Sequence, residues 1–210
     1  MPNWCDNTVT LEHTDPAMIE RAKKAFAEGK FLEEFIPVPA SLHIVSGRVG
    51  DKDSPEQIAL EAQEEANRKA HGYATWYDFC VNEWGTKWDV GADGNPAQDI
   101  PGGLMLGFDS AWAPPIQAYE KLIDMGFRIR AMYYEGGMAY AGIFDENGDD
   151  YYDYGGLDSA GIAETLPVEL DEAFCISESV AEWEAENEEE NLEIDLDGGL
   201  SAVNEQGDTK

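Results

Sequence analysis

Polar and apolar residues alternate near the start of the chain, and this alternation predicts a β-strand. Residues 7–12 (Asn-Thr-Val-Thr-Leu-Glu) repeat with period two, which is typical of a strand with one buried face. Residues 104–112 form a longer apolar run that predicts a second strand, and the Gly, Asp, Asn and Pro residues of 91–103 predict a loop before it. We expect a strand beginning at Lys87 to pair with 104–112 as a hairpin.

Apolar residues at helical spacing predict helices between these strands. The expected helices run from Pro16 to about Gly29, from Ser54 to about His71, from Ala74 to about Val81, and over residues 116–127. The first two begin with a polar capping residue followed by proline, which suits the first turn of a helix. The helix from Ser54 has few large apolar residues, so we expect it to lie on the surface as part of an insertion over about 46–82.

Two further strands are predicted at 128–134 and 138–144, and the Asn147-Gly148 pair predicts a tight turn before another strand. The order of elements is then that of a split β-α-β unit with a helical insert and extra strands. The sequence therefore predicts an α+β fold of the ferredoxin-like sandwich class, with an antiparallel sheet and helices on one face, over residues 1–156.

The C-terminal part is predicted to be an acidic helical extension over 157–197. A short helix is expected at Pro167–Phe174, followed by a helix over 180–186 capped by Ser177 or Ser179. Residues 198–210 have the composition of a disordered tail.

Acidic residues exceed basic ones throughout the chain, which has 44 Asp and Glu, 13 Lys and Arg, and a net charge of −31. Residues 169–210 hold 15 acids and one base, and residues 1–168 hold 29 acids and 12 bases. Direct binding to nucleic acid needs Lys and Arg for the phosphates, so this composition argues against it. Two interpretations stay open: the carboxylates only keep the protein in solution, or they imitate nucleic-acid phosphates toward a basic partner.

The extension carries the candidate acidic interaction surface. Its members are Glu182, Glu186, Glu189, Glu190 and Asp195. A solvated tail and an arm that engages a basic groove are both compatible with this pattern.

Enzyme and metal templates are not met. No P-loop, GxGxxG, GxSxG or HExxH motif occurs, and the three cysteines are too widely spaced for a metal clip. Cys5 with His13 or His43 would be a nucleophile and base only if the fold brought them together. Residues 145–150 alternate oxygen ligands, but the glycine is misplaced for a calcium loop, so they predict a hairpin turn. We expect no cofactor, no metal and no catalytic residue.

The stretch Trp84-Gly85-Thr86-Lys87-Trp88-Asp89 concentrates aromatic and charged residues, and it defines a candidate pocket. Its expected members are Trp84, Lys87, Trp88, Asp89, Asp109, Trp112 and Glu135. Lys87 and Asp89 would share one side of the expected strand. Three roles stay open for these residues: core anchors, a pocket for a ligand or peptide, or a catalytic site. Aromatic content alone does not decide among the three.

Several motifs resemble those of the YubB-like family, which is carried by bacteriophages and conjugative plasmids. They are Pro2-Asn3-Trp4-Cys5 with Asn7, Pro37-Val38-Pro39, Trp84 to Asp89, Ala111 to Pro115, and Tyr134 to Gly137 with Gly142. The resemblance covers residues 1 to about 145 and implies a ferredoxin-like module of mobile-element origin, without an established activity. One departure is that Ser110-Ala111-Trp112-Ala113-Pro114 stands where the family shows Thr-Ala-Trp-Ser-Pro, so Ala113 lacks the hydroxyl of the family's serine.

The leading hypothesis from the sequence is a non-enzymatic protein that binds a basic host protein, inhibiting a nucleic-acid-handling or defence factor as a DNA mimic. One alternative is a small-ligand binder or enzyme using the pocket around Trp84, Lys87, Asp89 and Trp112. Another is a virion or assembly component. No apolar run is long enough to cross a bilayer and the N-terminus lacks a signal-peptide pattern, so we expect a cytoplasmic protein without membrane contact.

Overall fold

The computed structural model describes residues 3–187, which fall into two compact units, one ending at Asp153 and the other beginning at Tyr154. Each unit is described by itself. Within the described residues, no helix combines the length and the apolar character needed to cross a membrane.

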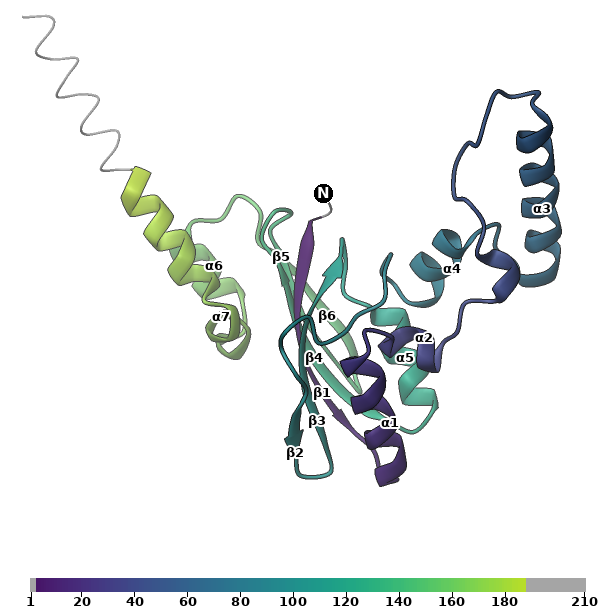
Figure 1. The fold of residues 1–210 in the computed structure, drawn as a ribbon. Coiled ribbons are helices and arrows are strands. Elements are labelled where there is room, and N and C mark those ends of the chain that lie inside the picture. The colour runs from purple at the N-terminus through teal and green to yellow at the C-terminus, as the bar shows by residue number, and fades with distance from the viewer. Residues whose placement is uncertain (1–2, 188–210) are drawn as a thin grey trace, which may run out of the picture. The chain divides into compact units, whose positions relative to one another are not determined.

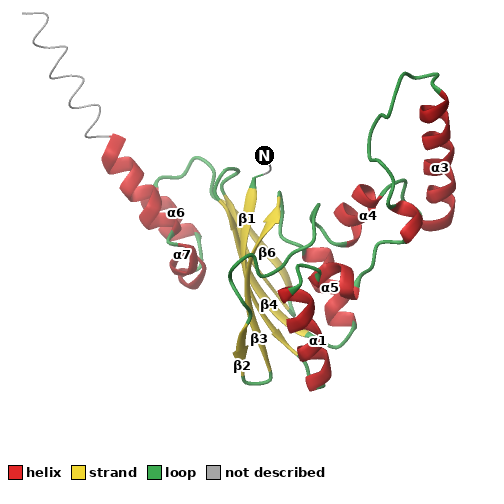
Figure 2. Ribbon diagram, in the orientation of Figure 1, coloured by secondary structure: helices red, strands yellow, loops and turns green. Residues whose placement is uncertain are grey.

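The first unit is an α+β structure built on one six-stranded antiparallel sheet (Figures 1 and 2). The strand order is β2-β3-β1-β4-β5-β6. The strands are β1 (Trp4–Glu12), β2 (Gln98–Ile100), β3 (Gly103–Ala111), β4 (Arg128–Glu135), β5 (Tyr140–Asp145) and β6 (Gly148–Asp153). Because every neighbouring pair is antiparallel, β1 runs parallel to β2 with β3 between them, and β3 runs parallel to β4 with β1 between them.

Alternation along β1 separates the two faces of the sheet. Cys5, Asn7, Val9 and Leu11 are buried, whereas the residues between them are half-buried or exposed. The predicted strand at 7–12 is confirmed, and the structure extends it back to Trp4.

Helices α1 (Pro16–Ala27) and α5 (Ile116–Asp124) lie against the same face of the sheet (Figure 1). Asp15 caps α1 by accepting a hydrogen bond from Ala17 N, and proline occupies the first turn, as predicted. Phe26 from α1 and Tyr119 from α5 are fully buried in the core. Their large apolar area accounts for much of the stabilising burial.

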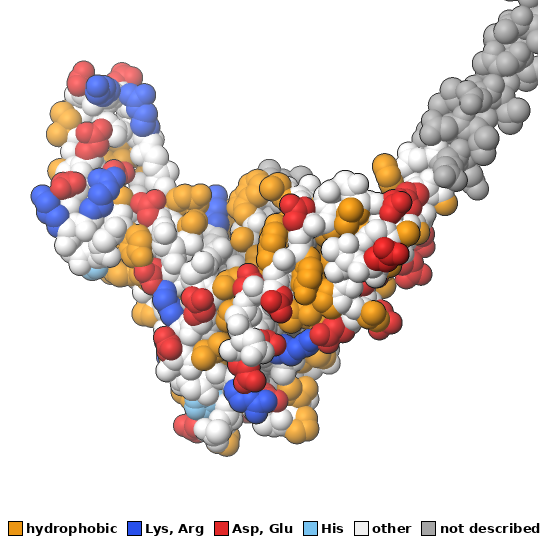
Figure 3. Space-filling view, turned by 180° about the vertical axis from the view of Figure 1, so that it is seen from behind, with side chains coloured by type: hydrophobic (Ala, Val, Ile, Leu, Met, Phe, Trp, Pro, Cys, Tyr) orange, Lys and Arg blue, Asp and Glu red, His pale blue; other side chains and the backbone are white. Residues whose placement is uncertain are grey.

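Between α1 and β2 the chain forms α2 (Phe31–Phe35), a 3₁₀ turn at Ala40–Leu42, α3 (Pro55–His71) and α4 (Trp76–Glu83), of which α3 and α4 correspond to the insertion expected over about 46–82. Ser54 caps α3 and Gly72 ends it in a left-handed conformation. Most of α3 is exposed, as expected, and it is held by Asn67, whose amide donates to Ser41 O and Ala74 O. Figure 3 shows acidic and basic side chains intermixed over this projecting region.

Two predicted features of the first unit are wrong. The residues from Lys87 onwards are not a strand, and the partner of β3 in the hairpin is β2 at Gln98–Ile100. Lys87 and Asp89 therefore do not share a strand face. The short helix α2 was not predicted, because five residues give no helical repeat to detect.

The second unit contains α6 (Ser159–Thr165), α7 (Val168–Phe174) and a helical segment over 176–187. The predicted helix at 167–174 is confirmed, but α6 was missed. The last segment begins before the expected caps: Ser177 lies inside it, and its N–H and hydroxyl both donate to the Asp171 carboxylate. The predicted disorder of 198–210 lies outside the described residues.

Candidate functional site

The stretch from Trp84 to Asp89 is a loop that follows α4 and fills a gap between the helical layer and the end of β3. Trp84 is 4% exposed, and its indole N–H donates to Ile36 O at 2.9 Å. Its carbonyl accepts from Ala118 N in α5 at 3.1 Å. Trp84 is therefore a core anchor that joins the insertion to α5.

Gly85 lets the loop turn against α5. Its φ is +90°, and a Cβ there would lie 2.1 Å from Gln117 Oε1 and 3.1 Å from Ile116 N. A side chain would be both strained and crowded at this position. The next residue, Thr86, then lies beside β3, where its hydroxyl accepts from Ala111 N and donates to Ala111 O, each at 3.0 Å. Thr86 thus satisfies the end of β3 as a neighbouring strand would.

Asp89 has a structural role at the start of α2. Its carboxylate accepts from Leu32 N at 2.6 Å, from Glu33 N at 3.0 Å and from Val90 N at 2.8 Å. Burial raises the pKa of Asp89, and these three donors oppose the increase. The side chain caps a helix whose own N-cap, Lys30, makes no side-chain cap bond.

Within the loop, Trp88 is exposed and the neighbouring Lys87 is half-buried. The Lys87 ammonium lies 4.6 Å from the ring centroid of Trp88 and 5.8 Å from that of Tyr77. Trp88 in turn contacts Trp4, with 5.8 Å between ring centroids. The loop therefore links α4 to β1 through a cation–π contact at Tyr77 and a tilted contact between the Trp4 and Trp88 rings.

A cavity of about 360 Å³ brings together four of the seven predicted pocket residues. Trp84, Lys87, Trp88 and Asp89 line it, and sequence analysis missed the further contributors Lys30, Glu33, His43, Trp76 and Cys80. Only the fold shows that the end of α1, α2 and α4 meet this loop, so no local pattern pointed to them.

Asp109, Trp112 and Glu135 do not line this cavity. Asp109 in β3 lies directly opposite Asp6 in β1. The pKa of Asp6 is raised, first by partial desolvation and then by the charge of Asp109. The two carboxylates thus repel each other across neighbouring strands.

Trp112 follows β3 with a φ of +73°, an uncommon conformation for a tryptophan. Its N–H donates to Asn3 O at 3.0 Å and its carbonyl accepts from Tyr140 at 2.8 Å, while its side chain stays 53% exposed. The backbone is held from both sides in a way that presents the indole to solvent.

Glu135 is buried at the end of β4. Its carboxylate accepts from Gly137 N at 2.9 Å and from Met138 N at 2.7 Å. It stabilises the β4–β5 turn, and both of its oxygens are used there.

A buried polar network joins β1, β3 and α5 near Trp112. Asn7 donates to Ser110 Oγ and to Cys5 O, each at 2.8 Å, and accepts from the Tyr119 hydroxyl at 3.3 Å. Ser110 donates to Ala113 O at 2.8 Å. The Ser110 hydroxyl is therefore buried and occupied by protein groups.

Cys5 is not placed for nucleophilic catalysis. Burial raises its pKa to about 12, so the thiol is protonated at neutral pH. His13 lies eight residues further along the same extended chain, roughly 26 Å away at about 3.3 Å per residue, and its ring packs on Phe127. Among residues 3–187, no group of three or more His, Cys, Asp or Glu side chains is arranged to hold a metal ion.

Of the candidate acidic interaction surface, Glu182 and Glu186 are exposed on the helical segment 176–187. Glu189, Glu190 and Asp195 lie outside the described residues. Sequence analysis missed Glu184, whose carboxylate accepts from Ser159 N at 3.1 Å and from its hydroxyl at 2.7 Å. That contact ties the segment to the start of α6.

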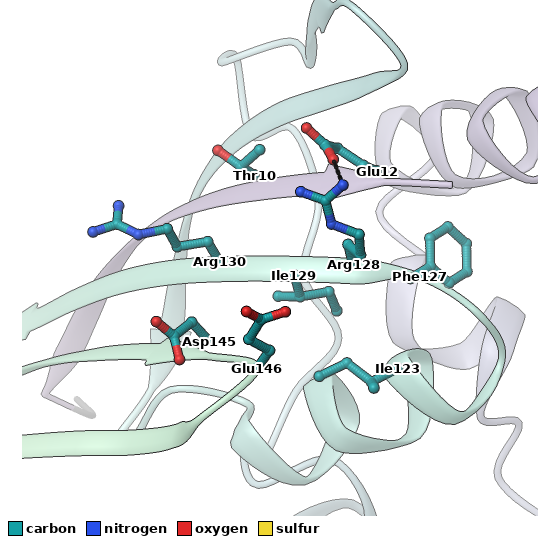
Figure 4. A pocket seen from close by; sticks show the side chains of 9 residues that line it. All are labelled: Thr10, Glu12, Ile123, Phe127, Arg128, Ile129, Arg130, Asp145 and Glu146. Atoms are coloured by element: carbon teal, nitrogen blue, oxygen red, sulfur yellow. Dashed lines mark ion pairs between the residues drawn. The ribbon is translucent and has the colours of Figure 1, made fainter. Parts of the chain in front are cut away.

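A second cavity, of about 420 Å³, lies where β4 separates from the β5–β6 turn (Figure 4). Figure 4 shows Arg128 turned toward Glu12, with which it forms an ion pair at 3.2 Å, while Arg130 extends in the other direction. Arg128 is thus already paired within the protein, and the rim also carries Asp145 and Glu146.

No family model and no curated protein matches the sequence. A solved structure with a similar chain is that of the protein api92 from Yersinia pseudotuberculosis, described with the family model DUF1281. The match has a TM-score of 0.37 and 13% sequence identity, and it covers 75% of this chain and 99% of that chain.

Proposed function

We propose that this protein acts in the cytoplasm of a host cell by binding a partner protein with a basic surface. The proposal includes the resemblance to the YubB-like family and the mobile-element origin that the resemblance implies. It also includes a ferredoxin-like sheet. The order β2-β3-β1-β4, with one strand inside each parallel pair, supports that class, and β5 and β6 extend the sheet beyond β4.

The observation that carries the proposal is an exposed tryptophan–aspartate patch, formed by Trp4, Asp6, Trp88, Asp109 and Trp112. The three indoles are 49%, 39% and 53% exposed, respectively. The Trp4 and Trp88 rings are in contact, and the backbones of Trp4 and Trp112 are adjacent, because Trp4 pairs with Ala111 and Trp112 N–H donates to Asn3 O. Tryptophan is enriched among the residues that dominate binding energy at protein interfaces. A cluster of exposed tryptophans on a monomer marks a binding surface.

The charge of the patch favours a basic partner. Asp6 and Asp109 lie directly opposite each other, and like charges in that position destabilise a sheet. A partner Lys or Arg placed between them would remove this repulsion. The net charge of −31 would also accelerate the approach of a positively charged protein.

The conformation of Trp112 supports the same assignment. A residue with a side chain at φ +73° costs free energy, and such strain is concentrated at functional sites. The backbone bonds to Asn3 and Tyr140 hold Trp112 in this state. The partner class we propose is a protein that normally contacts nucleic acid, because surfaces that bind phosphates are basic.

The test is capture from host lysate with the full chain and two charge-matched variants. Asp6→Asn/Asp109→Asn removes two charges from the patch, and Asp51→Asn/Asp53→Asn removes two from the exposed loop before α3. We expect the wild type and the loop variant to capture the same protein, and the patch variant to lose it. Added double-stranded DNA should release that protein if the carboxylates act as phosphate mimics.

Equal capture by the patch and loop variants would exclude the patch as the binding surface. If a protein is captured but DNA does not displace it, binding to a basic partner would stay supported and mimicry of nucleic acid would be excluded. A third variant, Glu182→Gln/Glu186→Gln, measures the contribution of the acidic extension, and loss of capture in it alone would move the interface to that segment.

A further inference from the structure

The cavity beside the patch has properties that the proposed protein interface does not use. It lies between the end of α1, α2, α4 and the Trp84–Asp89 loop, and its volume is about 360 Å³. This is near the lower end of the range of small-molecule sites, roughly 300–1,000 Å³. It therefore suits a ligand with one ring system and one charged group.

Three tryptophans line the cavity. Trp84 is buried, Trp76 is half-buried and Trp88 is partly exposed at the rim. Flat indole faces bind planar ring systems by stacking and exclude water from one side of the ligand. The cavity thus favours an aromatic ligand over an aliphatic one.

The cations that line the cavity are unusual within this protein. Among the twelve Lys and Arg side chains of residues 3–187, most are neutralised by nearby acids, for example Arg21 by Glu34 and Lys23 by Asp99. The described cations that make no ion pair are Lys30, Arg48, Lys52 and Lys87. Two of these four, Lys30 and Lys87, line the same cavity, together with the imidazole of His43.

The acids of the cavity are directed elsewhere. Both oxygens of Asp89 accept backbone N–H groups of α2 and Val90. Glu33 Oε2 accepts from Val38 N at 3.2 Å. Neither acid lies within ion-pairing distance of Lys30 or Lys87. These two acids therefore do not neutralise the Lys30 and Lys87 ammonium groups, which remain available to a ligand.

We propose that this cavity binds a small aromatic anion, a planar ring system that carries a phosphate or carboxylate. The ring lies against the tryptophan faces, and the anionic group meets Lys30 and Lys87. Trp88 and Tyr77 hold the Lys87 ammonium at 4.6 Å and 5.8 Å from their ring centroids. This pre-positioning lowers the entropy cost of binding the anion.

Isothermal titration of the full chain at one ionic strength tests the site with four probes. Adenosine monophosphate and indole-3-carboxylate are the two sources of an aromatic anion. Adenosine has the ring without the charge, and inorganic phosphate has the charge without the ring. We expect at least one aromatic anion to bind about tenfold or more tightly than adenosine and inorganic phosphate.

Charge-matched variants locate the binding. Lys30→Met/Lys87→Met should weaken the binding of the aromatic anion by about tenfold or more. Arg48→Met/Lys52→Met removes the two unpaired cations outside the cavity and should leave the affinity unchanged. Lys30→Met alone, on an exposed side chain, keeps the test valid if the double variant loses its circular dichroism spectrum.

If neither aromatic anion binds, the proposal is overturned. Equal losses of affinity in the two double variants would also overturn it. Inorganic phosphate binding as tightly as the nucleotide would reject the role of the tryptophans. The Asp6→Asn/Asp109→Asn variant should bind the probe normally, so failure of the protein interface and failure of this site are told apart.

Discussion

Asp89 caps helix α2 by accepting a hydrogen bond at 2.6 Å from Leu32 N, which lies 57 residues earlier in the chain. Helix α2 has only five residues, so its first N–H groups need an acceptor from elsewhere. Asp89→Ala removes that acceptor and should lower the free energy of unfolding by about 1–2 kcal/mol. Urea denaturation followed by circular dichroism measures the change.

The exposed carboxylate Asp51 serves as a control, because Asp51→Ala should change the free energy of unfolding by no more than about 0.5 kcal/mol. Equal midpoints for the two variants would contradict the capping role. Asp89→Ala should also loosen one wall of the cavity, because Asp89 holds the Trp84–Asp89 loop to the start of α2.

The hydrogen bond between Asn7 and Ser110 is expected to couple β1 to β3 energetically. Asn7→Ala leaves the Tyr119 hydroxyl without its acceptor, removes the donor to Ser110 Oγ and creates a small void, so we expect a loss of about 2–4 kcal/mol. Ser110→Ala should cost about 1–3 kcal/mol. In a double-mutant cycle the two losses should be non-additive by more than about 0.5 kcal/mol. Additive losses would show that the bond contributes nothing to stability.

Much of the sheet was predictable because its signals are local. The alternation at 7–12, the apolar run at 104–112 and the Asn147-Gly148 turn each reflect a period or a turn preference within a few residues. The predicted α+β class with an antiparallel sheet is confirmed. The helix from Ser54 was also correct within a residue or two, because its cap, its proline and Gly72 mark both ends.

The error at Lys87 has a physical origin. The stretch from Trp84 to Asp89 is rich in residues that favour strands. In the structure, however, Trp84 is buried in the core and Gly85 turns the chain. Thr86 then imitates a strand at Ala111 through its hydroxyl alone. Tertiary packing thus overrides local propensity, which has little weight in such a short segment.

The candidate pocket was half predictable for a related reason. Trp84, Lys87, Trp88 and Asp89 are consecutive or nearly so, and the cavity contains all four. Asp109 and Trp112 were included because of the wrong hairpin, and Glu135 does not line the cavity either. Lys30 precedes α2 and His43 follows the 3₁₀ turn at Ala40–Leu42, and no period in the sequence relates them to the loop.

The close packing of Tyr133 on Gly142 shows a feature that a motif alone does not explain. A Cβ at Gly142 would lie 2.2 Å from Tyr133 Cζ, its neighbour in the paired strand β4. The glycine therefore makes room for a fully buried ring. Nothing in the sequence around Gly142 identifies that ring.

The buried thiols should make stability fall at alkaline pH. Burial raises the pKa of Cys5 and of Cys80 to about 12, above the usual value of about 9. The folded state therefore holds these protons when the unfolded state has released them, so stability is complete below pH 9 and declines from there toward pH 12. Each thiol contributes a slope of about 1.4 kcal/mol per pH unit in that range. Denaturation at pH 8 and at pH 10 measures it.

Cys5→Ala should flatten this pH dependence, whereas Cys175→Ala, at an exposed position, should not change it. Thiol titration gives an independent reading: one thiol per native chain should react with Ellman's reagent, and three after unfolding. Rapid reaction of all three in the native protein would show that the burial of Cys5 and Cys80 is not maintained in solution.

The Asp6–Asp109 pair should show opposite effects on stability and on partner binding. Asp109→Asn removes a like charge directly across from Asp6, so we expect the free energy of unfolding at pH 7 to rise by a few tenths to about 1 kcal/mol. The pKa of Asp6 should also fall toward its ordinary value, because one of the causes that raise it is gone. Thermal unfolding and NMR titration of the Asp6 carboxyl measure the two changes, with Asp51→Asn as the charge-matched control. Capture of the basic partner should weaken in the same variant. A variant that is more stable and binds equally well would mean that the repulsion serves no interface, and the tryptophan–aspartate patch would then lose its electrostatic support.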